Sequence, residues 1–300
     1  MIKLKEQKAS LNLYDDDVIK WEEDGKKCAI RVASDDCPDS PREGYDYNQN
    51  IMACFHPRYN LGDRDLGQYD MKNPEDFWRD LVRSHVPSDE LIDRAFAGEL
   101  PNIQIRKLDD ELFDLLCRED YNDEWFTQER NVESSTLYVS LVDILTVDEC
   151  QTIMEPHAEW LPLWLYDHSG ISMSCGTRTY PYNDRWDSGQ IGWIITLKES
   201  VPESKRQNDD ETWRKKAVES MALDVELYDL YLRGDCYGLV YYEYEDGEWI
   251  EKDSCFGFYG SDIYRNGMLE YVGTDLKKAL EDDMVERTHA KRHYTVTFDF

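Results

Sequence analysis

An excess of acidic side chains is the feature that most constrains this chain. The 300 residues include 64 Asp and Glu against 34 Lys and Arg, which gives a formal net charge of −30 at pH 7. Unpaired carboxylates are costly to bury, so most of them must lie at the surface. The core must therefore come from the hydrophobic 41%, which includes 20 Tyr and 9 Trp. That fraction is too high for a disordered chain, and the length allows one large domain or two smaller ones.

The same charge narrows the class of partner. Nucleic acid phosphates and anionic membrane surfaces repel an acidic protein, so we expect no direct nucleic-acid partner and no membrane partner. No run of about 18 apolar residues predicts a transmembrane helix. The first residues, Met1 to Glu6, lack the apolar core of a signal peptide. We expect a protein of the cytoplasm whose partners are basic proteins.

Cysteine spacing favours neither a disulfide scaffold nor a metal centre. The eight cysteines are spread over the chain without a CxxC pair, which predicts free thiols in a reducing compartment. Cys28, Cys37, Cys54 and His56 are a possible zinc set, but their spacing is not that of known zinc sites. The acidic run at 15–17 lacks the pattern of a calcium loop, and phosphate-binding glycine motifs are absent. We therefore expect no metal and no cofactor.

Local patterns predict alternating strands and helices. Strands are expected at 27–34, 51–56, 161–166, 191–197, 237–244, 249–259 and 294–298, and helices at 74–83, 88–98, 213–228 and 276–284. The run 137–145 fits a buried strand or a helix equally well. Glu245-Asp246-Gly247 predicts a hairpin turn. The predicted class is α+β, a mostly antiparallel sheet with helices on one face, plus an acidic helical insertion.

The segment 109–133 is the most acidic part of the chain. It holds ten acidic and two basic residues, while Leu112, Leu115 and Leu116 fit one stripe of a helix. An amphipathic helix with an acidic outer face, followed by a loop, is expected there. The chain is accordingly divided into an acidic arm (1–25), an N-terminal α+β part (26–108), an acidic, mainly helical insertion (109–160) and a C-terminal α+β part (161–300). For 1–25, a first strand followed by a turn is the alternative to an arm.

Two charged sets are candidates for contact with other proteins. Acidic residues expected to face a basic partner are Asp109, Asp110, Asp114, Glu119, Asp120, Asp123 and Glu124. Basic residues expected at an oligomer or partner contact are Lys205, Arg206, Arg214, Lys215, Lys291 and Arg292. An oligomer of so acidic a chain would need apolar contact or basic patches of this kind.

The segments 166–170 and 186–192 form the densest polar constellation. If the chain is an enzyme, Asp167 or Asp187 could orient His168 as a base toward Ser169 or a water, with Gln190 nearby. Successive strand residues point to opposite faces, so Asp167 is poorly placed to orient His168. The alternative is a hydrogen-bonded pair of loops with Trp186 packed beneath. In either case, the segments 166–176 and 183–192 should lie side by side.

An ordered set of motifs resembles acidic accessory proteins of phages, prophages and plasmids. The matching pieces cover about half of the chain, within 28–65 and 160–270, and they read PRE (41–43), HPRYNLGD (56–63), LPLWLYDHSGI (161–171), WDSGQIG (186–192), YxxYLxGDxYG (228–238) and DSCFGFYG (253–260). The acidic stretch between the matching pieces resembles an insertion that is particular to this chain.

The resemblance implies an inhibitor of bacterial defence rather than an enzyme. Among such proteins, phage anti-Gabija proteins are similar in length and charge, and they assemble as oligomers around a host nuclease complex and block its access to DNA. By this resemblance the chain would act in the host bacterial cytoplasm as a homo-oligomer bound to a defence nuclease. Two alternatives remain open. One is a nucleotide-signal hydrolase using the 166–170 and 186–192 loops. The other is a DNA-mimic antirestriction protein, which needs one continuous acidic face.

Overall fold

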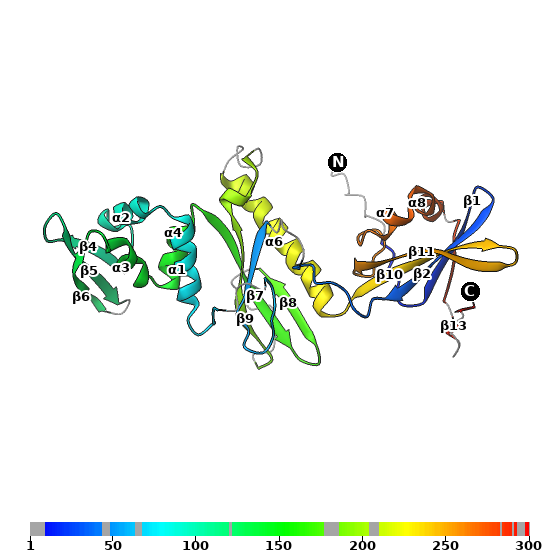
Figure 1. Ribbon diagram of the computed structural model, residues 1–300, viewed down its shortest axis with the longest axis horizontal. Helices are drawn as coiled ribbons and strands as arrows, with labels where there is room; N and C mark the ends of the chain where they lie inside the picture. The colour runs from blue at the N-terminus through cyan, green and yellow to red at the C-terminus, as the bar shows by residue number, and fades with distance from the viewer. Residues whose placement is uncertain are drawn as a thin grey trace, which may run out of the picture.

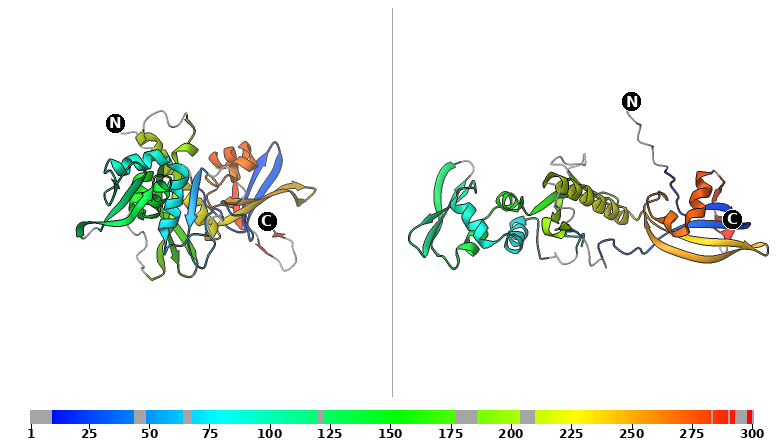
Figure 2. Two further views of the ribbon diagram at one scale, coloured as in Figure 1. Left: turned by 60° about the vertical axis from the view of Figure 1, so that its left-hand side comes forward. Right: turned by 90° about the horizontal axis from the view of Figure 1, so that it is seen from above.

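The computed structural model of the chain places most residues. It describes residues 10–43, 49–63, 68–119, 122–176, 186–203, 210–282, 284–289, 291–292 and 298–299. These residues form three groups of elements arranged in a row, so the molecule is elongated (Figures 1 and 2). The chain passes through the row and returns, because β1 and β2 lie in the same group as the last elements.

The first group, which we call the terminal group, is a five-stranded antiparallel sheet. Its order is β11 (Glu248–Tyr259), β10 (Cys236–Glu245), β2 (Lys26–Ser34), β1 (Asp17–Glu23) and β12 (Glu286–His289). The helices α7 (Met268–Val272) and α8 (Thr274–Glu281) share a core with the sheet residues Ile19, Ile30 and Leu239. The short strands β13 (Lys291–Arg292) and β14 (Phe298–Asp299) pair with each other. For the described part of 1–25 the arm is wrong and the alternative of a first strand and a turn is confirmed, because β1 pairs with β2 and Asp24 and Gly25 adopt the positive φ of a hairpin turn.

The central group is a four-stranded antiparallel sheet that has one long helix on one face. The order is β3 (Asn50–Cys54), β9 (Ser188–Leu197), β7 (Ala158–Asp167) and β8 (Ile171–Cys175), and a short 3₁₀ helix, η2 (Lys198–Ser200), follows β9. Helix α6 (Asp210–Leu232) buries Trp213, Met221 and Val225 against Leu163 and Ile194 of the sheet. The helical spacing predicted over 213–228 is confirmed, and α6 runs from this group to the terminal group (Figure 1).

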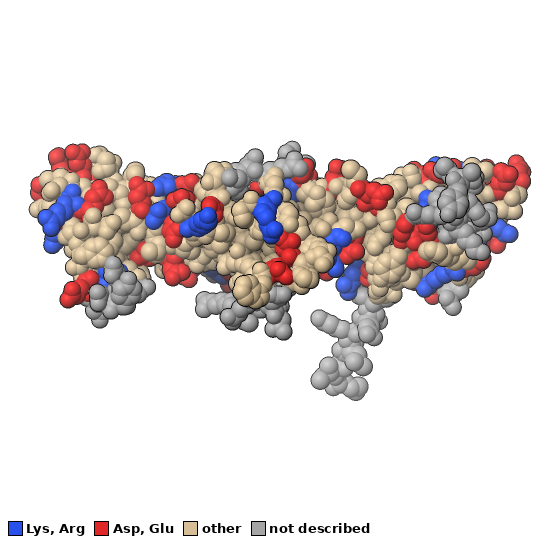
Figure 3. Space-filling model, turned by 90° about the horizontal axis from the view of Figure 1, so that it is seen from below, with Lys and Arg blue, Asp and Glu red and all other residues tan. Residues whose placement is uncertain are grey.

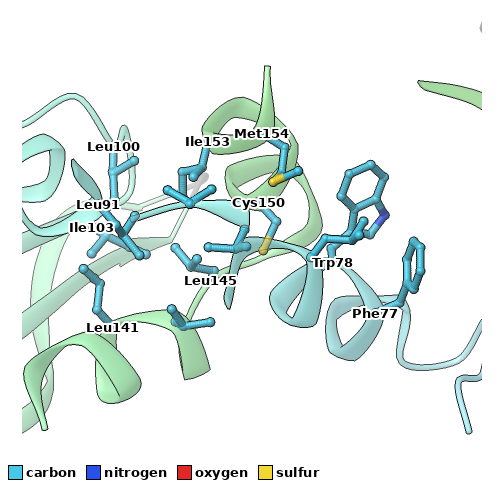
Figure 4. Packing of buried hydrophobic residues seen from close by; sticks show 14 of the residues in the cluster. Phe77, Trp78, Leu91, Leu100, Ile103, Leu141, Leu145, Cys150, Ile153 and Met154 are labelled. Carbon is cyan, nitrogen blue, oxygen red and sulfur yellow. The ribbon is translucent and has the colours of Figure 1, made fainter. Parts of the chain in front are cut away.

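The remote group joins four helices to a three-stranded sheet. The helices are α1 (Pro74–His85), α2 (Ser88–Phe96), α3 (Leu137–Asp143) and α4 (Val147–Met154), and the strands are β4 (Ile103–Lys107), β5 (Leu112–Glu119) and β6 (Asn122–Glu133). Side chains from all four helices converge on one interior (Figure 4). That core continues onto the central sheet through Phe55, Trp193 and Ile195. The run 137–145, left open by its sequence, is mostly helical.

The helix expected over 109–133 is wrong, because this segment is a turn followed by the β5–β6 hairpin. Phe113 and Leu115 alternate into the core, as strand residues do. Asp109 is a turn residue, since its Oδ1 accepts hydrogen bonds from the backbone N–H groups of Glu111 and Leu112, both at 2.8 Å. In the described part of the expected helical insertion, only α3 (Leu137–Asp143) and α4 (Val147–Met154) are helical.

The α+β class and the antiparallel pairing are confirmed. The strands are divided among separate sheets instead of forming one. The predicted division at residues 108 and 160 does not follow the three groups, since β2 pairs with β10 and β3 with β9. Partners so far apart in sequence leave no local signal of their pairing.

Candidate functional site

The structure brings the two polar segments together at one end of the central sheet. β7 and β9 are paired up to Tyr166 and Ser188, and the Asp167 N–H donates to the Asp187 carbonyl at 2.7 Å. Ser169 and Gly170 adopt positive φ in the turn between β7 and β8. The expected proximity is therefore confirmed where 166–168 meets 187–188, whereas β8 lies on the other side of β7 from β9. Residues 183–185 lie outside the described residues.

His168 is partnered by Asp187 and not by its neighbour. The His168 Nδ1 lies 2.7 Å from Asp187 Oδ2, and the side chain of His168 is 61% exposed. Asp167 instead accepts from the Arg58 guanidinium and from the Tyr59 hydroxyl. Among the described residues, no hydrogen bond joins His168 to Ser169. Within the described residues, His168 is held by a carboxylate, and no hydrogen bond joins it to a nucleophilic side chain.

Trp186 does not pack beneath these loops. The residue is 95% exposed. Gln190 lies on β9, where its side-chain amide donates to the Gly192 carbonyl at 3.2 Å. Gln190 therefore supports its own strand and does not face His168 through any hydrogen bond described.

Arg58 and Tyr59 were not predicted from the sequence as partners of Asp167. The ring of His56 stacks on Tyr59 with centroids 5.0 Å apart, and the Arg58 guanidinium lies 5.4 Å from the same ring. Burial, together with the positive charge of Arg58, lowers the pKa of His56. Arg58 and Tyr59 belong to the motif at 56–63, which the sequence does single out. That motif is far from residue 167 in the sequence, so its contact with Asp167 could not be predicted.

Other motif residues hold the central group together. Arg42 is buried, and its guanidinium donates to Asp63, Asp224 and the Asn50 carbonyl at 2.8–3.2 Å. Gly62 and Gly192 lie against the backbone of β3, where an added Cβ would meet carbonyl oxygens of Met52 at 2.3 Å and Ala53 at 1.8 Å. Packing and hydrogen bonding therefore explain the residue types at these motif positions without any catalytic role.

The possible zinc residues do not converge. Cys28 is buried in β2 of the terminal sheet, while Cys54 is buried in β3 of the central sheet. Burial raises the pKa of the Cys54 thiol far above its ordinary value. In the described part of the chain, no three His, Cys, Asp or Glu side chains are grouped to hold a metal ion.

The acidic contact set divides into surface and buried members. Asp109 and Asp110 lie in the β4–β5 turn, and Glu124 is exposed on β6. Asp114 is only 4% exposed, pairs with Arg106 and accepts from the Asn131 N–H at 3.1 Å, so its expected exposure is wrong. These donors lower the pKa of Asp114. Glu119 and Asp123 lie on the hairpin strands, and Asp120 is outside the described residues.

The basic set is partly used inside the protein. Arg214 of α6 pairs with Glu159 at 2.7 Å and donates to the carbonyls of Ala158 and Glu155. Lys215 is exposed on the same helix, and Lys291 and Arg292 form β13. Lys205 and Arg206 lie outside the described residues.

A groove between the central and remote groups was not foreseen. It has a volume of about 1060 Å³ and lies where α4 faces β7 and β9. Its lining residues are Val147, Asp148, Gln151, Thr152, Glu155, Glu159, Trp160, Leu161, Pro162, Trp164, Gly176, Gln190, Trp193 and Arg214. The groove is therefore an aromatic surface with acidic residues along it, which we call the tryptophan groove.

Comparisons of the chain with protein-family models, with curated proteins and with solved structures found no match. None of the helices described combines the length and apolar character that crossing a bilayer requires.

Proposed function

We propose that this chain is a phage-encoded inhibitor that binds a bacterial defence complex of the Gabija nuclease type and covers its route to DNA. The observation that carries the proposal is the distribution of acidic residues over all three groups of an elongated body. Exposed acids of the described chain include Glu99, Glu111, Glu124, Asp148, Glu155, Glu226, Glu248, Glu251 and Glu281.

A long acidic body suits attachment to a DNA-binding complex. The surface of such a complex that receives DNA carries positive charge, and opposite charges on two proteins accelerate their association. An elongated partner can span more of that surface than a compact one of the same mass. Binding of this kind needs no catalytic residue on the inhibitor.

The charge pattern favours a protein-like contact over imitation of DNA. On the face drawn in Figure 3, acidic and basic side chains are interspersed and do not form one acidic band. Several acids are engaged by arginines, as in the pairs of Arg83 with Asp80 and of Arg233 with Asp229. A mixed surface can recognise one complementary partner, whereas imitation of a phosphate array needs a continuous run of negative charge.

We propose that the inhibitor works as a homo-oligomer. Lys215 is exposed on α6 and supplies positive charge beside many carboxylates. Arg214 is less available for such a contact, because it is already engaged with Glu159. Replacement of Lys215 by Glu should therefore lower the oligomeric state measured by light scattering, while Lys252→Glu on β11 serves as a matched change elsewhere.

Co-expression of this chain with affinity-tagged defence complexes tests the proposed function. We expect the chain to co-purify with a nuclease complex and to remain bound through gel filtration. The amount of nuclease complex that co-purifies should be compared between two double variants. One carries Glu111→Lys and Glu124→Lys in the remote group, and the other carries Glu248→Lys and Glu251→Lys in the terminal group. Both pairs replace exposed acids. No stable complex with any defence nuclease would contradict the proposal.

A hydrolase is the second candidate, because His168 and Asp187 are in hydrogen-bond contact. A histidine held by a carboxylate is a common general base. An enzyme would clear a nucleotide signal when present at far less than its substrate, and His168→Ala or Asp187→Asn would abolish that clearance. Gln190→Ala should leave it unchanged if Gln190 only supports β9.

A further inference from the structure

The tryptophan groove lies between two faces that the described residues leave open. Leu161, Leu163 and Leu165 of β7 belong to the core beneath α6. Alternation along the strand places Trp160, Pro162 and Trp164 on the opposite face. The remote group covers only part of that face, through Trp160 and Trp193. Pro162 and Trp164 therefore remain in the wall of an open groove.

The facing wall is the outer side of α4. Cys150, Ile153 and Met154 of this helix are buried in the shared core. Asp148, Gln151, Thr152 and Glu155 turn toward the groove instead. Its volume, about 1060 Å³, is at the upper limit of small-molecule pockets. A groove of this size has room for a segment of polypeptide.

The groove already binds a cationic side chain of this protein. The Arg214 guanidinium contacts the Glu159 carboxylate and two backbone carbonyls, and it lies 5.0 Å from the centre of the Trp213 ring. Carboxylate, carbonyl and aromatic face are the three surfaces that bind a guanidinium. Asp148, Glu155 and Trp164, which also line the groove, are side chains of the same chemical kinds.

We propose that the tryptophan groove binds an extended cationic segment of a partner protein, with a lysine or arginine side chain against Trp164 and with its neighbours near Asp148 and Glu155. The proposal rests on the proposed function only in that the partner is a basic protein. Charge complementarity decides the occupant, because a net charge of −30 attracts cations and repels nucleic acids.

Calorimetric titration with a short acetylated and amidated peptide of alternating arginine and leucine tests this directly, at physiological salt and without any defence complex. The same peptide with glutamine for arginine is the control ligand. We expect the arginine peptide to bind and the glutamine peptide to bind at least tenfold more weakly, a difference of about 1.4 kcal/mol.

Two variant pairs separate the groove from the general acidity of the surface. Asp148→Lys with Glu155→Lys should weaken peptide binding about tenfold, because the change lies at the groove. Glu248→Lys with Glu251→Lys alters the net charge equally at the far end of the molecule and should weaken it less than about twofold, since salt screens distant charges. Trp164→Leu should weaken binding about three- to tenfold while circular dichroism shows an unchanged fold.

Equal losses in the two charge pairs, or no binding of the arginine peptide, would overturn the proposal. Binding of an uncharged oligosaccharide that is lost in Trp164→Leu would also overturn it and would make the groove a carbohydrate site. Peptide binding at the groove without inhibition of any defence complex would contradict the proposed function and leave the groove standing. Inhibition that survives both groove variants would contradict the groove alone.

Discussion

The central sheet and the β5–β6 hairpin differ in how many of their faces are buried. The central sheet packs against α6 on one face and partly against the remote group on the other, so β9 is buried along almost all of its apolar run. The hairpin buries apolar side chains on one face only, through Phe113, Leu115 and Val132. Burial on two faces leaves a continuous apolar run in the sequence, whereas burial on one face leaves a thin alternating pattern.

The two regions also use their polar residues differently from what their sequences indicate. In the central group, Arg42 and the glycines of the motifs hold backbone segments in place. In the hairpin, Asp109 forms a turn and Asp114 binds Arg106. In both regions, the polar residues that stand out in the sequence stabilise the fold. Contact with partners is then expected from the exposed side chains around them.

Replacement of Gly192 by Ala should have the largest effect on stability. The added Cβ would meet the Ala53 carbonyl at 1.8 Å, and the φ of 154° disfavours other residues. We expect the free energy of unfolding to fall by about 4 kcal/mol, measured by denaturant titration. Gly189→Ala in the same strand has open space around it and is the control. An equal loss in the two variants would contradict the close packing of β3 on β9.

Replacement of Arg42 by Met should have the next largest effect on stability. It leaves Asp63 and Asp224 without the guanidinium that lies between them. Breaking a buried ion pair on one side costs about 3 kcal/mol or more. Arg58→Met removes an exposed arginine from Asp167, and such surface pairs contribute about 1 kcal/mol or less. Equal effects of the two changes would show that the buried network does not hold the central group.

Replacement of Asp114 by Asn should have a smaller effect that depends on pH. The folded state lowers the pKa of Asp114, so its contribution is complete above the unfolded value near about 4 and is lost as the pH falls through the folded value. The melting temperature of the variant should be lower than that of the parent at pH 7, and the difference should shrink below about pH 4.

Asp110→Asn is the control for this pH dependence. Asp110 is an exposed turn residue, and Lys107 is its one basic partner described. Its replacement should lower the melting temperature less than that of Asp114 at every pH. A larger effect at Asp110 would mean that the hairpin depends on its turn more than on the Arg106–Asp114 pair.

Much of the fold could be predicted from the sequence where the local pattern and the tertiary burial agree. The strands around 27–34 and 191–197 and the helix over 213–228 were predicted because their apolar residues face a core at one clear spacing. The hairpin was not, because Leu112, Leu115 and Leu116 also fit a helix. The pairing of β2 with β10 could not be predicted, since it joins residues about two hundred positions apart.

The candidate site was predicted only in part. Strand ends indicated that 166–170 and 186–192 would meet, and they do. The partners of Asp167 come from residues 58 and 59, and the tryptophan groove needs α4 to lie across the face of β7. Both depend on the placement of distant segments, about which the spacing within a motif carries no information.

The central claim is that this chain acts by binding a defence complex and not by turnover. A titration of the purified protein against a fixed amount of its target nuclease, with DNA cleavage as the readout, tests it most directly. We predict that inhibition rises linearly and is complete near the stoichiometry of the complex, with His168→Ala as effective as the parent. Full inhibition at about one molecule per hundred targets, abolished by His168→Ala, would contradict the claim and establish the enzyme.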